Sequence, residues 1–162
     1  MRYAQQVVQL VCLLCVSLPL WAQPTVSDAW IPEAPPVSTV MAGFMTIHNS
    51  ATKEAQLIAV TSVQFADVQM HLSLEENGVA KMLPQKTLTI PAQGQLALKQ
   101  GSYHLMLFNP VAALKAGDKV TLSLRFADGS VLPVVVEVKK ATGKKTGHEK
   151  MKMNMDGSHR CY

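Results

Sequence analysis

The chain has 162 residues, of which 48% are hydrophobic and 16% charged, and its formal net charge at pH 7 is +4. This length suffices for one well-packed domain rather than two. Seven Lys/Arg and two acidic residues lie from Lys139 onward, whereas residues 23–138 carry seven Lys/Arg and nine Asp/Glu. The basic charge therefore belongs to the C-terminal segment, and the mildly acidic body argues against nucleic-acid binding by the folded part.

Residues 1–22 have the features of a secretory signal peptide. Arg2 is the only positive charge, an apolar core runs from Val7 to Leu20, and Ala22 ends a segment suited to signal-peptidase cleavage. Neither cysteine of this segment follows the small residue of a lipoprotein signal, so we expect a cleaved leader and a periplasmic protein, with an uncleaved anchor as the alternative. After cleavage only Cys161 remains, which excludes an intramolecular disulfide.

Residues 23–140 carry the pattern of an all-β domain. Short alternating segments are separated by turn residues such as Asn77-Gly78 and Asp128-Gly129, and a single helical turn is expected at Val111–Leu114. Eight or nine short strands with so little helix predict a Greek-key β-sandwich or barrel. The expected strands are Val26–Ile31, Val40–Asn49, Gln56–Val63, Asp67–Glu75, a partner strand after Gly78, a short segment with Leu88–Pro91 and Gln95–Leu98 broken by Ala92-Gln93-Gly94, Tyr103–Phe108, Lys119–Phe126 and Val131–Val138.

The best-defined element is a hairpin around Asn77-Gly78, a sequence that favours a two-residue type I′ turn. If Glu76 pairs with Val79, His71 lies opposite Pro84 and Met82 lies opposite Ser73. His71 and Met82 would then be diagonal neighbours on one outer, exposed face, roughly 7–8 Å apart at the backbone. The opposite face is expected to belong to the core and carries Met70, Leu72, Leu74, Val79 and Leu83.

A second His/Met pair lies on a later strand. His104 and Met106 are two residues apart, so they project from one side of that strand, opposite its leucines. Imidazole suits copper, and thioether is a soft ligand that selects the cuprous ion. We therefore predict one Cu(I) bound by His71, Met82, His104 and Met106. The alternative is that the methionines fill the core and the histidines are ordinary surface groups.

These residues resemble the motif of the PCu(A)C family of periplasmic copper chaperones. His71 is followed after ten residues by Met82 and after another twenty-one by His104-Leu105-Met106, and the segment Gly101-Ser102-Tyr103 before them also fits. Family members often carry an extra methionine beside the first histidine. Here that neighbour is Met70, which the register places on the core face, so it is not counted as a ligand.

The resemblance implies a cupredoxin-like fold and a role in carrying Cu(I). It also implies a recipient, namely the copper centre of cytochrome c oxidase subunit II, reached directly or with a thioredoxin-fold copper assembly factor. A monomer without enzymatic activity is expected. A copper electron-transfer module is a further hypothesis, but blue-copper centres need a Cys thiolate, and residues 23–140 contain no cysteine, which argues strongly against it.

Residues 141–162 differ in composition from the body. They have almost no aliphatic side chains and many lysines, so we expect a flexible tail that does not fold alone. A second copper site for Cu(II) or Cu(I) is a hypothesis for this tail, and a merely solubilising extension is the alternative. With such a site, periplasmic copper storage or resistance competes with the chaperone function. The tail's candidate ligands are His148, Met151, Met153, Met155 and His159.

Overall fold

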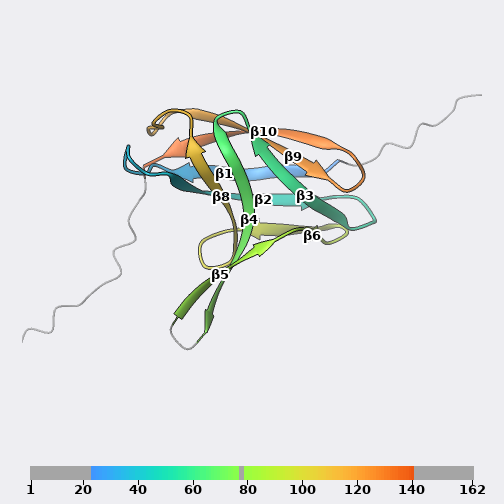
Figure 1. Cartoon of the computed structure of the whole chain (residues 1–162). Coiled ribbons are helices and arrows are strands. Elements are labelled where there is room, and N and C mark those ends of the chain that lie inside the picture. Colours follow the sequence, from blue (N-terminus) through green and yellow to red (C-terminus); the bar gives the residue numbers. More distant parts are fainter. Residues whose placement is uncertain (1–22, 77–78, 141–162) are drawn as a thin grey trace, which may run out of the picture.

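The computed structural model describes residues 23–76 and 79–140, which form ten β-strands joined by turns (Figure 1). The predicted leader, the tail and the two central turn residues of the Asn77-Gly78 hairpin lie outside the described residues. No helix in the described part could cross a membrane. The strands are β1 (Thr25–Pro32), β2 (Val40–Asn49), β3 (Ala55–Ser62), β4 (Phe65–Glu76), β5 (Val79–Gln85), β6 (Leu88–Ile90), β7 (Gly94–Leu98), β8 (Tyr103–Pro110), β9 (Lys119–Phe126) and β10 (Val131–Lys139).

The strands pair in the order β5-β4-β8-β2-β1-β10-β9-β3-β6, and β7 also pairs with β2. All pairs are antiparallel except β1 with β10. Strand β2 joins the two sheets, because its residues 40–43 pair with β8 and its residues 45–49 pair with β7. The all-β sandwich or barrel expected from the sequence is confirmed.

The core lies between the two sheets and follows the alternation of the strands. Strand β9 buries every second residue, and Leu105 and Leu107 of β8 are fully buried. Gly43 of β2 lies directly against them, since a Cβ at this position would come within 3.3 Å of the Leu105 Cβ. Further core residues on these strands are Met41, Met45, Ile47, Val120, Leu122, Leu124 and Phe126.

The helical turn expected at Val111–Leu114 is absent from the structure, so that prediction was wrong. Strand β8 instead continues to Pro110, which pairs with Phe65 of β4. The amide of Val111 then donates to the carbonyl of Gln64, a partner far away in sequence. Backbone pairing with distant residues therefore extends through the position where the helical turn was expected to begin.

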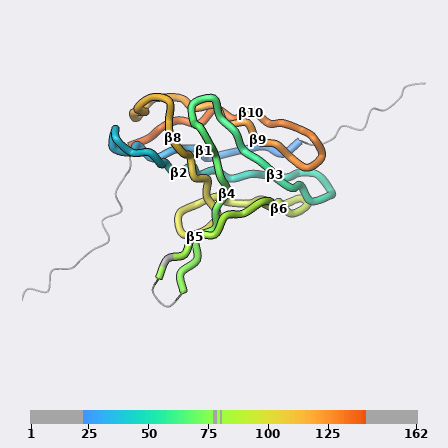
Figure 2. Tube along the Cα trace, viewed as in Figure 1, coloured from blue at the N-terminus to red at the C-terminus, as the bar shows by residue number. Residues whose placement is uncertain are grey.

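The β4–β5 hairpin has the predicted register but projects beyond the sandwich (Figure 1). Figure 2 shows the trace of this hairpin extending away from the other strands. Pairing of β4 with β8 ends at Leu72, so the outer part of the hairpin is two-stranded. Its apolar face is consequently exposed, and the prediction of core positions there was wrong for Leu74, Val79 and Leu83, with exposed fractions of 45, 59 and 43%.

Candidate metal centre

Three adjacent strands bring the four predicted ligands to one face of the sheet. His71 of β4 lies directly opposite His104 of β8, and their ring centroids are 6.1 Å apart. Met106 lies opposite Gln69, and Met82 of β5 lies opposite Ser73. Both methionines are therefore diagonal neighbours of His71, at backbone distances of roughly 7–8 Å. The shared face and the register are confirmed, whereas the ligand set itself stays a prediction.

The four side chains differ in exposure. His71 and His104 are 9% and 6% exposed and so are buried, Met106 is half-buried, and Met82 is 57% exposed. The expectation of an exposed site was therefore wrong for the histidines. Burial in a sheet layer lowers the contact of both rings with water.

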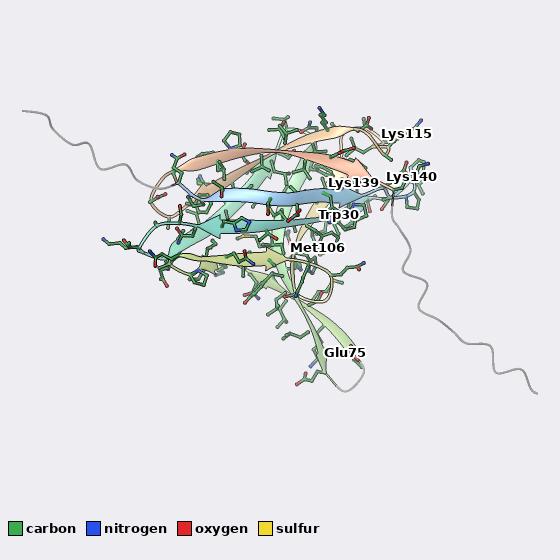
Figure 3. The ribbon with its side chains drawn as sticks, turned by 180° about the vertical axis from the view of Figure 1, so that it is seen from behind. Trp30, Glu75, Met106, Lys115, Lys139 and Lys140 are labelled. Carbon is green, nitrogen blue, oxygen red and sulfur yellow. The ribbon has the colours of Figure 1, made fainter. Side chains whose placement is uncertain are left out.

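An aromatic pair continues the same face of the sheet. Ala42 of β2 lies opposite Met106, and Phe44, two residues later, projects from the same side. Phe44 is buried and packs against Trp30 of β1, with ring centroids 5.2 Å apart. Figure 3 labels Trp30 of β1 and Met106 of β8, the strands on either side of β2. The candidate centre therefore adjoins an apolar surface.

The orientation of the His104 ring is fixed by a contact with the residue two positions before it. Its Nδ1 lies 3.0 Å from the carbonyl oxygen of Ser102. A carbonyl oxygen only accepts, so Nδ1 carries the proton and donates it. The lone pair of the neutral ring is then on Nε2, which is available to a metal ion.

The ring of His71 has a different environment. Its Nε2 lies 3.0 Å from Oε1 of Gln69, and the amide of Gln69 donates to Oδ2 of Asp67 over 2.7 Å. The Nδ1 of His71 is buried and has no hydrogen-bond partner. Burial lowers the pKa of His71 below its ordinary value of 6.5, and the neighbouring His104 lowers that pKa further. The imidazole is therefore neutral at pH 7, the state that binds metal.

Three residues that hold these rings were not identified from the sequence: Asp67, Gln69 and Ser102. Asp67 and Gln69 lie four and two residues before His71 on the same face of β4, and Ser102 lies two residues before His104, just before β8 begins. The alternation Asp67-x-Gln69-x-His71 could have indicated the first two, because residues at every second position share a face.

The described residues contain no cluster of three or more His, Cys, Asp and Glu side chains that could hold a metal ion. Met82 and Met106 share this face with the paired histidines and offer thioether sulfur. Such a donor set suits Cu(I) rather than zinc, magnesium or calcium.

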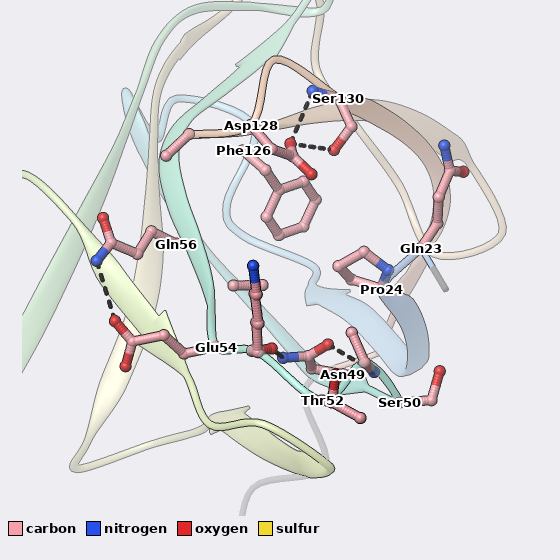
Figure 4. Close-up of a pocket in the computed structure, with 14 residues that line it drawn as sticks. Gln23, Pro24, Asn49, Ser50, Thr52, Glu54, Gln56, Phe126, Asp128 and Ser130 are labelled. Carbon is pink, nitrogen blue, oxygen red and sulfur yellow. Dashed lines mark hydrogen bonds between the residues drawn. The ribbon is translucent and has the colours of Figure 1, made fainter. Parts of the chain in front are cut away.

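A pocket of about 790 Å³ lies elsewhere, between the β2–β3 connection and the β9–β10 turn (Figure 4). Its lining includes no His, Met or Cys side chain. The buried Asn49 at its edge uses its amide to donate to the carbonyls of Lys53, Ile90 and Pro91. Asn49 therefore ties loops together, and the pocket offers no soft ligand for copper.

A family model described as LpqE-like, a lipoprotein family, matches residues 24–138. The chain is 37% identical over 119 residues to Lxx21020 of Leifsonia xyli subsp. xyli, a lipoprotein by its name, covering 73% of this chain and 70% of that protein. It is 28% identical over 119 residues to the uncharacterized protein RP573 of Rickettsia prowazekii. That match covers 73% of this chain but only 62% of the Rickettsia protein.

Solved structures share the fold. The copper-bound PCuAC domain from PmoF2 superposes with a TM-score of 0.61 at 19% identity, covering 72% of this chain and 92% of that domain. Apo-DR1885 from Deinococcus radiodurans superposes with a TM-score of 0.58 at 30% identity, covering 75% and 81% of the two chains. The same protein with Cu(I) gives a TM-score of 0.56 at 27% identity, covering 79% and 83%. The cupredoxin-like fold is thereby confirmed, and the chain belongs to the LpqE-like family.

Proposed function

We propose that this protein is a periplasmic copper chaperone whose body binds one Cu(I) through His71, Met82, His104 and Met106. The proposal rests chiefly on the cross-strand pair of buried histidines with a diagonal methionine on each side. The relatives support it, because a PCuAC domain of this fold and DR1885 are both known in copper-bound form.

The distance between the two rings fits a shared ion. A metal–nitrogen bond of about 2 Å added to an imidazole radius of about 1.1 Å places each ring centroid roughly 3 Å from the metal. Two rings on one ion can therefore have centroids roughly 5 Å apart at a tetrahedral angle and up to roughly 6 Å apart when the nitrogens are opposite each other. The observed separation of 6.1 Å lies at the upper end of this range, so a four-ligand site would require the two rings to approach each other by about 1 Å.

Neutral ligands suit a carrier that must also release its cargo. Two imidazoles and two thioethers add no negative charge to hold the ion, and Met82 is exposed to an incoming partner. The protein would act by transfer rather than catalysis. The recipient in this proposal is the copper centre of cytochrome c oxidase subunit II, directly or with a thioredoxin-fold assembly factor.

The test is a competition between the protein and a Cu(I)-specific chelator under anaerobic, reducing conditions. Wild-type residues 23–140 should bind one equivalent, and the double variant Met82→Leu/Met106→Leu should bind much more weakly. Equal affinity of the two proteins would contradict the ligand set. Mixing the loaded protein with the apo copper domain of subunit II, followed by separation and metal analysis, tests the recipient.

The tail carries a second, independent proposal that rests on sequence alone. Its methionines at every second position lie between His148 and His159 and would hold an additional Cu(II) or Cu(I), which would make the protein a copper store as well. Truncation after Lys140 should keep one Cu(I) and lose a Cu(II) equivalent that is released as the pH falls through about 6.5. Identical copper uptake by both forms would contradict a tail site.

Export is part of the same proposal. The leader 1–22 would be removed, so that the mature chain begins at or near Gln23. Mass spectrometry of the exported protein measures this directly, and retention of the leader would indicate a membrane-tethered carrier.

A further inference from the structure

We propose that His71 binds Cu(I) through Nδ1 while His104 binds it through Nε2, and that Gln69, held by Asp67, is the positioning residue that sets the Nδ1 mode. The inference rests on the proposed function, since it names the ligand atoms of that site. The tautomers of the two rings in the apo protein can be tested without copper.

The orientation of the Gln69 amide follows from its two contacts. The carboxylate of Asp67 only accepts hydrogen bonds, so the NH₂ group of Gln69 is the end that faces Oδ2, at 2.7 Å. The carbonyl oxygen of Gln69 is then the end that faces His71, at 3.0 Å from Nε2. An acceptor at this position requires a proton on Nε2.

The proton on Nε2 determines the rest of the His71 ring. A neutral imidazole has a single N–H, so Nδ1 carries the lone pair. That nitrogen is buried without a hydrogen-bond partner, and a buried polar atom of this kind needs an explanation. A metal ion would supply the missing partner.

The relay resembles the outer shell of other metal-binding histidines, in which the nitrogen that does not bind metal donates to a carboxylate, carbonyl or water. In this chain an amide stands between the histidine and the carboxylate. Asp67 and Gln69 are exposed, so solvent screens the charge of Asp67, and its role is to hold the amide with the carbonyl oxygen toward Nε2.

The opposite assignment holds for His104. Its Nδ1 donates to the Ser102 carbonyl at 3.0 Å, which leaves Nε2 as the lone-pair nitrogen. The two rings of the pair are thus held in different tautomers by contacts two residues upstream of each. An ion between them would be bound asymmetrically.

Long-range ¹H–¹⁵N correlation spectra of the labelled apo protein at neutral pH test the tautomers. We expect a protonated Nε2 in His71 and a protonated Nδ1 in His104. Addition of Cu(I) should then shift Nδ1 of His71 and Nε2 of His104. A proton on Nδ1 of His71 in the wild-type protein, or a Cu(I) shift on its Nε2 instead, would overturn the proposal.

Substitutions test the role of Gln69. Gln69→Leu removes the acceptor, so His71 should populate both tautomers and the Cu(I) affinity should fall about 10–100-fold. Gln69→Glu keeps an acceptor opposite Nε2 and should therefore retain the Nε2–H tautomer of His71. Gln95→Leu, a matched change of an exposed glutamine on β7, should alter neither quantity. Unchanged tautomer and affinity in Gln69→Leu would overturn the positioning role.

The wild-type spectrum decides the tautomer assignment even if Gln69→Leu does not fold. A wild-type protein that shows the expected tautomers but takes up no Cu(I) would overturn the proposed function and the ligand assignment, while leaving the relay in the apo protein established. The two failures are therefore distinguishable.

Discussion

The histidine half and the methionine half of the candidate centre are held in different ways. The two histidines are buried at the edge of the sandwich, and each ring has a fixed hydrogen bond from its own strand. Met82 is exposed on the projecting hairpin, and Met106 is half-buried. A carrier needs both properties, since rigid ligands define the site and accessible ones allow the ion to leave. We therefore predict that the two histidines determine the Cu(I) affinity, whereas the exposed thioether of Met82 determines how fast the ion is exchanged.

Removing a histidine should have the largest effect. His104→Ala deletes a buried imidazole whose partner ring lies 6.1 Å away, so Cu(I) affinity should fall by more than the roughly 10–100-fold expected for losing an outer-shell partner. The matched control is His48→Ala, which removes a histidine bonded to Ser27 and away from the site. Chelator competition measures both, and equal losses would contradict a site specific to the pair.

Two methionines on opposite faces of the same hairpin sharpen the comparison. Met82→Leu should weaken Cu(I) binding about tenfold or more, equivalent to about 1.4 kcal/mol. It should change the free energy of unfolding by no more than about 0.5 kcal/mol. Met70→Leu changes the buried core neighbour of His71 and should leave Cu(I) affinity unchanged at a stability cost below about 1.5 kcal/mol. If Met70→Leu weakens Cu(I) binding as much as Met82→Leu does, Met70 is a ligand and the core assignment of its side chain fails.

The burial of His71 also predicts a pH dependence of apo-protein stability. The pKa of His71 is lowered on folding, so below about pH 6.5 the unfolded chain binds more protons than the folded one. Stability should therefore decrease as the pH falls from about 6.5 through the lower pKa of the folded state. Urea unfolding between pH 7 and 5 measures this, and His71→Gln should flatten the slope. The lowered pKa of Asp128, caused by its hydrogen bonds to Ser130, acts only near and below its ordinary value of 3.8, so it does not contribute in this range.

The register of the site could be predicted from the sequence, whereas its surroundings could not. The alternation of β4 and the Asn77-Gly78 signal were enough to pair Glu76 with Val79 and Ser73 with Met82. Local patterns set such pairings, because a shift of one residue would turn every side chain to the other face. The direct pairing of His71 with His104 joins strands thirty residues apart and was visible only in the fold.

Burial was the property that local patterns predicted worst. The hairpin alternates as a core strand does, yet its outer half has no second layer above it, and the histidines on the supposed outer face are covered. Whether a face is covered depends on where neighbouring strands end, here at the Leu72–Tyr103 pair, and the alternation carries no information on that point. The Gln69 relay was missed for a different reason: Gln69 is exposed, as a glutamine on a strand face ordinarily is, and the alternation does not show that its amide contacts His71.

The exposed apolar face of the hairpin gives the smallest expected effect. Leu74 lies beyond the last β4–β8 pair, so its side chain has no second sheet to pack on. Leu74→Thr introduces a β-branched strand former and should change the unfolding free energy by no more than about 0.5 kcal/mol. Leu105→Ala, in the fully buried part of β8, should cost about 2–5 kcal/mol. Chemical denaturation compares the two, and Cu(I) affinity should be unchanged in Leu74→Thr because the site lies on the other face. A loss of several kcal/mol in Leu74→Thr would mean that this face is covered in solution, and the hairpin would then be part of the rigid body rather than an accessible arm.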